Sequence, residues 1–161
     1  MGQSFTRPSL TGQGITLARL TAEEITVRRA RHGDVDAVLG LWAQARSEHA
    51  SMSDSREDLE RLVEGSPAAL LVAEATGEIV GAVIAGWDGW RGNIYRLAVE
   101  GAYRRRGMGV QLVRAAERYF RDCGGRRVTA LVAYDDAEAG SFWDAAGYPQ
   151  DTAIGRRVRN L

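Results

Sequence analysis

Lysine is absent from this 161-residue sequence, and all 21 of its basic residues are arginines. The absence excludes catalysis by a lysine of the chain and excludes a nucleotide-binding P-loop, which requires a Gly-Lys pair. A single cysteine, Cys123, excludes an intramolecular disulfide and a cysteine-rich metal site. The two histidines, His32 and His49, are isolated from each other in the sequence, so no metal site is predicted.

Net charge and long apolar runs are lacking as well. The 21 basic residues balance 21 acidic ones, which argues against wholesale binding to nucleic acid or to a membrane surface. No apolar run approaches the roughly 18 residues that a membrane span needs, and the first residues show no apolar signal sequence. With 45% hydrophobic and 26% charged residues, the composition predicts a cytoplasmic globular protein.

The length predicts a single domain, because 161 residues can bury one continuous core but not two. Residues 1–24 are rich in Gly, Ser and Thr and are predicted to form an N-terminal extension. Residues 25–161 form the predicted domain, and hydrophobic periodicity divides them into strands and helices. The first part is predicted to hold a strand over 25–31, a helix that Asp34 caps, and a second helix over 56–65.

The middle of the chain has the pattern of a hairpin over 69–75 and 78–88, followed by another strand up to residue 100. A helix follows from Gly109, with an apolar face that ends before Gly124. The remaining predicted elements are a buried strand over 126–133, a helix stopped by Gly147, and a final edge strand over 152–159. The predicted order is therefore β-α-α-β-β-β-α-β-α-β.

Three arginines, at 104–106, precede the helix that starts at Gly109, where the positive helix end would favour acidic residues instead. A strand, a glycine-containing turn and a helix in succession can present free backbone N–H groups to an anion. Gly107 and Gly109 would let a phosphate approach the main chain. A dinucleotide fingerprint does not fit, because residues 107–112 read GMGVQL and lack its third glycine.

The stretch R-x-x-G-x-G at 104–109, together with A-x-x-F-W-x-x-x-G-Y at 139–148, resembles the signature blocks of the GCN5-related N-acetyltransferases (GNAT). The resemblance spans roughly residues 25–148, and the turn GWDGWRG at 86–92 is similar to that of small bacterial members. The resemblance implies a fold that combines helices and strands (α/β, more narrowly α+β), in which helices flank a mixed, mostly antiparallel sheet. It also implies transfer of an acetyl group from acetyl-coenzyme A to a primary amine of a small molecule or protein.

The resemblance assigns roles to individual residues. The backbone of Leu97, Ala98 and Val99 would pair with the pantetheine arm, and an amide near Val99 would hold the thioester oxygen. The main chain of the following turn would wrap the pyrophosphate through Arg104, Arg105, Arg106, Gly107, Met108, Gly109 and Val110. The second block would add cofactor contacts from Ala139, Phe142, Trp143 and Asp136, the last of which stands where the family has a cofactor-binding asparagine.

At the positions of the family's general acid and general base, two residues of this sequence depart from the pattern. The tyrosine often proposed as general acid falls at Trp143, whose indole N–H cannot protonate a thiolate, so the proton would come from Tyr134 or water, or no acid is needed. The glutamate that acts as base in histone-acetylating relatives falls at Asn93. Asn93 and Tyr95 share one strand face by their spacing and would act only by ordering a relay water.

Simpler interpretations remain open beside these. The arginines could form a solvated basic face or a nucleic-acid patch, although no nucleic-acid or membrane partner is expected. Phe142 and Trp143 could serve packing alone, and Asp136 could simply cap the helix that follows it. The alternative function is a catalytically weak coenzyme A-binding sensor or regulatory module on the same fold. A monomer or homodimer is expected.

Overall fold

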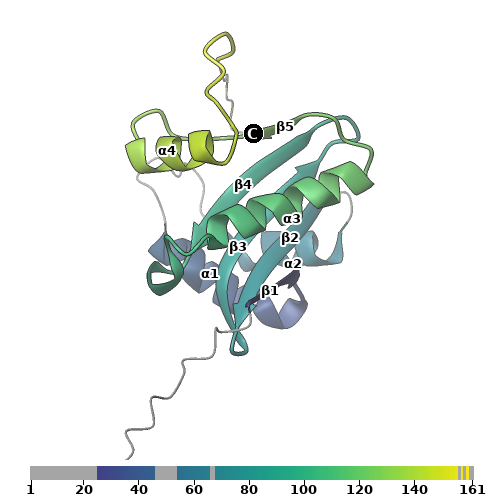
Figure 1. The fold of residues 1–161 in the computed structure, drawn as a ribbon. Helices are drawn as coiled ribbons and strands as arrows, with labels where there is room; N and C mark the ends of the chain where they lie inside the picture. Colours follow the sequence, from purple (N-terminus) through teal and green to yellow (C-terminus); the bar gives the residue numbers. More distant parts are fainter. Residues whose placement is uncertain (1–24, 46–53, 66–67, 156, 158, 160–161) are drawn as a thin grey trace, which may run out of the picture.

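The computed structural model describes residues 25–45, 54–65, 68–155, 157 and 159 of the chain. Their strands form one sheet in the order β1-β2-β3-β4-β5 (Figure 1). The first four strands pair antiparallel, and β5 joins β4 in parallel, which confirms the mixed, mostly antiparallel sheet. The strands are β1 (Ile25–Arg29), β2 (Ala68–Ala75), β3 (Glu78–Trp87), β4 (Gly92–Val99) and β5 (Val128–Ala130). The predicted extension over 1–24 and His49 lie outside the described residues.

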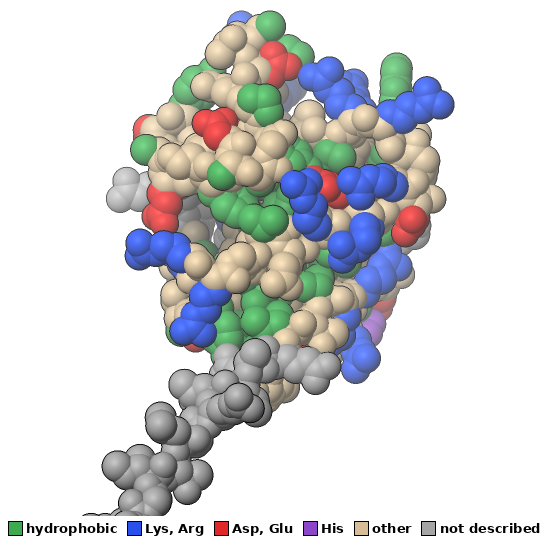
Figure 2. Space-filling view, in the orientation of Figure 1, with side chains coloured by type: hydrophobic (Ala, Val, Ile, Leu, Met, Phe, Trp, Pro, Cys, Tyr) green, Lys and Arg blue, Asp and Glu red, His purple; other side chains and the backbone are tan. Residues whose placement is uncertain are grey.

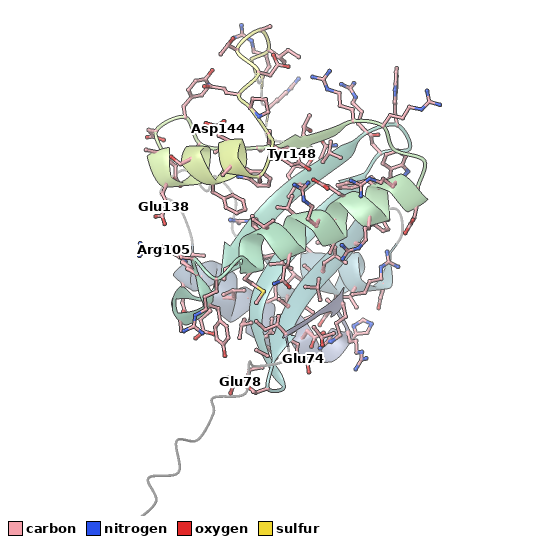
Figure 3. All side chains as sticks on the ribbon, viewed as in Figure 1. Glu74, Glu78, Arg105, Glu138, Asp144 and Tyr148 are labelled. Carbon is pink, nitrogen blue, oxygen red and sulfur yellow. The ribbon has the colours of Figure 1, made fainter. Side chains whose placement is uncertain are left out.

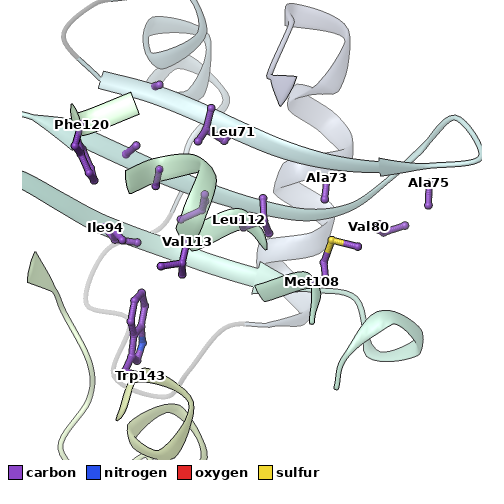
Figure 4. Close-up of a cluster of buried hydrophobic side chains, with 14 residues drawn as sticks. Leu71, Ala73, Ala75, Val80, Ile94, Met108, Leu112, Val113, Phe120 and Trp143 are labelled. Atoms are coloured by element: carbon purple, nitrogen blue, oxygen red, sulfur yellow. The ribbon is translucent and has the colours of Figure 1, made fainter. Parts of the chain in front are cut away.

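Helices cover both faces of this sheet. Alternate residues of β2 belong to two separate hydrophobic clusters, with Leu71 and Ala73 in one and Leu70 and Val72 in the other. The first cluster lies under α3 and α4, and the second lies under α1 and α2 (Figures 1 and 4). The helices are α1 (Val35–Gln44), α2 (Arg56–Glu64), α3 (Met108–Asp122) and α4 (Ala137–Ala145). No helix in these described ranges is long and apolar enough to cross a membrane.

Helix α3 forms the centre of the first cluster. Its buried apolar face holds Met108, Leu112, Val113, Ala116 and Phe120, at most 1% exposed (Figure 4). The apolar face that periodicity predicts is therefore present, and the helix ends as predicted before Gly124, whose φ is +84°. This helix therefore fixes where the turn before it lies against the sheet.

The last two predicted strands differ from the structure. The strand predicted over 126–133 is only Val128–Ala130, because Leu131 and Val132 leave the sheet and are exposed. The predicted edge strand over 152–159 is wrong for the described residues of that range, none of which is in a strand. There the side chain of Asp151 accepts a hydrogen bond from the Ala153 amide at 3.2 Å, which favours a local turn over strand pairing.

Asp34 lies at the N-cap of α1, as predicted, but its carboxylate does not cap that helix. The Arg28 guanidinium donates to both Asp34 oxygens, at 2.7 and 3.0 Å, and to Glu74 at 2.7 Å. This hydrogen-bonded guanidinium lowers the pKa of Asp34 despite the partial burial of the carboxylate. The three side chains tie β1 to β2 and to the start of α1.

Glu117 is a charged residue buried in α3, only 7% exposed. Burial by itself would raise its pKa, but the Arg114 guanidinium at 2.7 Å, the Tyr148 hydroxyl at 3.1 Å and Arg121 together lower it. Because Tyr148 follows α4, these hydrogen bonds hold the end of α4 against α3 (Figure 3).

We predict that Gly92→Ala and Gly40→Ala change stability in opposite directions. A Cβ at Gly92 would lie 2.6 Å from the Phe120 ring, so the alanine should cost about 1–3 kcal/mol by overpacking. Gly40 is exposed inside α1 with open space at its Cβ position, so alanine there should stabilise by about 0.5–1 kcal/mol. Urea denaturation measures both, and equal effects of the two substitutions would contradict the packing described.

Glu117→Gln should lower the free energy of unfolding at pH 7 by about 1–2 kcal/mol, since charged hydrogen bonds are lost. The folded-state pKa of Glu117 lies below its ordinary 4.5, so this stabilisation is present above that value and is lost as pH falls through the lower folded pKa. The gap between the two proteins should therefore shrink in urea titrations below about pH 4. Arg118→Gln, on the exposed side of the same helix, is the control and should show no such pH dependence.

Candidate functional site

Strand β4 loses its neighbour β5 part-way along its length. β5 pairs only with Gly92, Asn93 and Ile94, whereas β4 continues to Val99. Where the strands still pair, the Thr129 hydroxyl donates to the Asn93 side-chain oxygen at 2.6 Å. Within the described residues, no strand pairs with this side of β4 after Ile94. The second half of β4 therefore has an open edge at which a ligand can pair with the backbone.

The peptide groups at Val99 face this open edge. On the opposite side, the Glu100 amide donates to the Val80 carbonyl of β3 at 2.9 Å. Because successive residues of a strand point their N–H and C=O groups to opposite sides, those of Val99 point away from β3. The Arg104 side chain confirms this direction, since its Nε donates to the Val99 carbonyl at 3.0 Å.

A bulge in the same half of β4 changes the directions of its side chains. Ala98 pairs with Ala82 and Tyr95 with Ile84, so β4 contains one residue more than β3 in this interval. Arg96 has a φ of +54°, in the left-handed region that a non-glycine residue occupies at a cost of about 1–3 kcal/mol. Asn93 and Tyr95 therefore share one face of the sheet as strict alternation of side chains predicts, but the alternation does not continue after Tyr95.

Helix α3 begins without a capping side chain. Its N-cap is Gly107 at φ +80°, no side chain accepts a hydrogen bond there, and its first turn contains no acidic residue. The helical ladder starts where the Gln111 amide donates to the Gly107 carbonyl at 3.0 Å. The amides of residues 108–110 precede that ladder and carry the partial positive charge of the helix end. This arrangement suits an anion such as a phosphate.

The three arginines at 104–106 take different positions around the start of α3. Arg104 binds the Val99 carbonyl and so joins the turn to the open edge of β4. The Arg106 guanidinium lies 5.9 Å above the Tyr103 ring. Arg105 is exposed at φ +57°, and Figure 3 places it on the loop before α3, on the side where α4 begins. Basic side chains also outnumber acidic ones over α3 in Figure 2.

Helix α4 packs against the start of α3. A Cβ at Gly109 would lie 3.0 Å from the Phe142 ring, so this glycine is needed for packing, whereas Gly107 is needed for its φ. Trp143 is 8% exposed and makes edge contacts with Phe142 at 5.3 Å and Tyr148 at 5.1 Å between ring centroids. Ala139 packs against the same cluster. These contacts account for the α4 residues by packing alone.

Asp136 has the capping contact that the simpler interpretation predicts. It is the N-cap of α4, and its carboxylate accepts a hydrogen bond from the Ala139 amide at 2.9 Å. One carboxylate oxygen is therefore engaged within the protein.

The structure brings some of the predicted site residues together and separates others. The backbone of 97–99 and the turn at 104–107 meet through the bond from Arg104 to Val99. Leu97 and Val99 direct their side chains to the α3 cluster, and Ala98 is buried on the opposite face. Met108 is buried at the start of α3, and Val110 is 38% exposed. Tyr134 is 86% exposed in the loop between β5 and α4.

Sequence reasoning missed an ion pair on the face that α1 and α2 cover. Arg96 at the bulge contacts the Asp54 carboxylate at 2.5 Å, just before α2, and lies 5.9 Å above the Trp42 ring of α1. The one hint in the sequence was a charged residue, Arg96, inside a predicted strand. The direction of the Arg96 side chain depends on the bulge, which no sequence pattern indicates.

Comparisons with known proteins identify the family of this chain. The model of the acetyltransferase (GNAT) family matches residues 35–148. An acetyltransferase of Sodalis glossinidius is 30% identical over 128 residues, covering 80% of this chain and 89% of that protein. An acetyltransferase of Pectobacterium atrosepticum is 35% identical over 117 residues, covering 72% and 82%.

Solved structures share the fold at lower identity. Aminoglycoside N-acetyltransferase AAC(6')-Iy, in complex with coenzyme A, superposes with a TM-score of 0.73 at 20% identity, covering 88% of this chain and 99% of its own. Glucosamine-6-phosphate N-acetyltransferase from Arabidopsis thaliana gives a TM-score of 0.68 at 15% identity, covering 86% and 100%. With the family model matching most of its length, the chain belongs to the acetyltransferase (GNAT) family.

Proposed function

We propose that this chain transfers an acetyl group from acetyl-coenzyme A to a primary amine of a small molecule or a protein. The observation that carries the proposal is the uncapped start of α3 lying against the open edge of β4, joined to it by the bond from Arg104 to Val99. Family membership and the coenzyme A complex of AAC(6')-Iy support the same acyl donor.

The residues present fit the chemistry of coenzyme A. Its pyrophosphate is a compact polyanion, which the amides of 108–110 and the arginines at 104–106 would bind through charge-assisted hydrogen bonds. Its pantetheine arm carries amide groups, which would pair with the open backbone of 97–99 as an added strand does. When bound, the donor supplies a thioester carbonyl beside Val99.

The reaction would be a direct attack on that thioester. The neutral amine forms a C–N bond to the acyl carbon, the C–S bond breaks, and the sulfur leaves as a thiolate while the amine loses one proton. The Val99 N–H points to the open edge and would stabilise the developing oxyanion. Positioning of the two substrates supplies most of the remaining acceleration.

The groups proposed for proton transfer are only weak acids or bases. Asn93 already accepts a hydrogen bond from Thr129, so with Tyr95 it would order a relay water rather than act as the base. Tyr134, in its exposed loop, or a water would protonate the thiolate. Trp143 is buried in the core and supplies no proton. This last feature favours the second candidate, a coenzyme A sensor with little turnover.

Thiol release with acetyl-coenzyme A and a panel of primary amines separates the two functions. We expect amine-dependent release that saturates in both substrates, because a donor bound along the open edge of β4 would present its carbonyl to a second molecule. Calorimetry with coenzyme A accompanies the assay. Binding of coenzyme A without release for any amine would support the sensor, and absence of binding would contradict both.

Gly107→Asp should weaken coenzyme A binding about tenfold or more relative to Gly107→Asn, because it places a negative charge at the phosphate site. Both side chains tolerate the left-handed φ of this position and have the same shape, so the pair isolates the charge. Calorimetry gives the affinities, and thermal unfolding confirms that both variants fold. Equal affinities of the two variants would refute the phosphate site at α3.

A further inference from the structure

A groove on the exposed side of α3 begins at the proposed phosphate site. It has a volume of about 320 Å³ and is lined by Val27 of β1 and by Val110, Gln111, Arg114 and Arg118 of α3. Val110 belongs to the first turn of the helix, whose free amides would bind the pyrophosphate. A ligand held at those amides can therefore continue into the groove. The inference that follows rests on the function proposed above.

Two arginines are spaced along this groove. Arg114 and Arg118 follow Val110 by four and eight residues, which is about 6 and 12 Å of helix. Together with Gln111 they have the i, i+3 and i+7 spacing of a single helix face. Helical side chains lean toward the N-terminus of their helix, which here is the phosphate site. The groove therefore presents cations at increasing distance from that site.

The charge of the groove remains positive after its ion pairs are counted. Arg114 and Arg121 both contact the Glu117 carboxylate, at 2.7 and 3.1 Å, so two cations share one anion. Arg118 is exposed, and in the part of the chain that the structure describes no carboxylate forms an ion pair with it. Basic side chains accordingly gather over α3 in Figure 2. The Arg118 guanidinium is thus available to an anionic ligand.

The other direction away from the phosphate site, along α4, is acidic. Residues 135–147 contain four acidic residues and no basic one. Of these, Asp136, Glu138 and Asp144 are exposed, and Figure 3 shows Glu138 extending from α4 toward the loop that carries Arg105. A phosphate on this side would be repelled by the carboxylates of α4, whereas along α3 it would meet arginines. The charges therefore favour a path along α3.

We propose that the adenosine half of coenzyme A lies in the groove along α3, and that Arg118 binds the phosphate on its ribose. This ribose phosphate is separate from the pyrophosphate, so a ligand anchored at residues 108–110 has a second anion to place. The planar Arg118 guanidinium can bind a phosphate through two parallel hydrogen bonds, and the Gln111 side-chain amide can donate another. Val27 and Val110 offer an apolar surface to the adenine. Arg118 acts through its side chain alone.

The test compares coenzyme A with dephospho-coenzyme A, which lacks only the ribose phosphate, by calorimetry. We expect the wild type to bind coenzyme A about tenfold or more tightly than the dephospho form, because a charged hydrogen-bonded pair is lost with that phosphate. Arg118→Gln should remove most of this preference through weaker binding of coenzyme A alone. Arg126→Gln removes an exposed arginine beyond the far end of α3 and should keep the preference.

Several results would overturn the inference. Equal affinities of the wild type for the two ligands would mean that no group binds the ribose phosphate, while the donor site at the start of α3 would stand. A preference that persists in Arg118→Gln and increases in Glu138→Gln would place that phosphate beside α4 instead. Thermal unfolding checks the fold of each variant. If Arg118→Gln does not fold, Arg118→Lys decides, because it loses the planar fork and should reduce the preference, and an unchanged preference would refute the contact. Binding of neither ligand contradicts the proposed function itself, and this inference with it.

Discussion

The proposed site depends on two places where backbone groups are not paired within their own strand or helix. β4 extends past its partner β5, so the peptide groups around Val99 face an open edge, and α3 starts at Gly107 with no side chain to cap its first amides. Such groups can bind a ligand in place of water, because an open strand edge and a helix N-terminus both present backbone groups that the element itself does not pair. The bond from Arg104 to Val99 brings the two places together. One molecule with a phosphate end and an amide-bearing arm would satisfy both.

Different helices cover the two faces of the sheet. α3 and α4 bury one face, and Phe142 against Gly109 and Glu117 against Tyr148 lock these helices together near the phosphate end. The other face carries the bulge, which directs Arg96 toward α1 and α2. There Arg96 adopts a φ of +54° and pairs with the Asp54 carboxylate, which ties the bulge to the start of α2.

Sequence patterns predicted the parts of this architecture that depend on local periodicity and on glycine. The apolar face of α3, the hairpin of β2 and β3, and the turn ending at Gly107 all follow from residue types at fixed spacing. The final strand over 152–159 was mispredicted for its described residues, because the residue types of a short segment say nothing about whether a neighbouring strand is there to pair with. The pair of Arg96 and Asp54 escaped prediction because a bulge and a contact across 42 residues leave no local pattern.

The central claim is that one ligand occupies both the open edge of β4 and the start of α3. Titration of ¹⁵N-labelled protein with coenzyme A, followed by amide chemical shifts, tests it directly. The account predicts that the largest shifts fall on residues 97–99 and on Arg105, Gly107 and the amides of 108–110. Shifts concentrated instead on the exposed arginines of α3, such as Arg114 and Arg118, would contradict it.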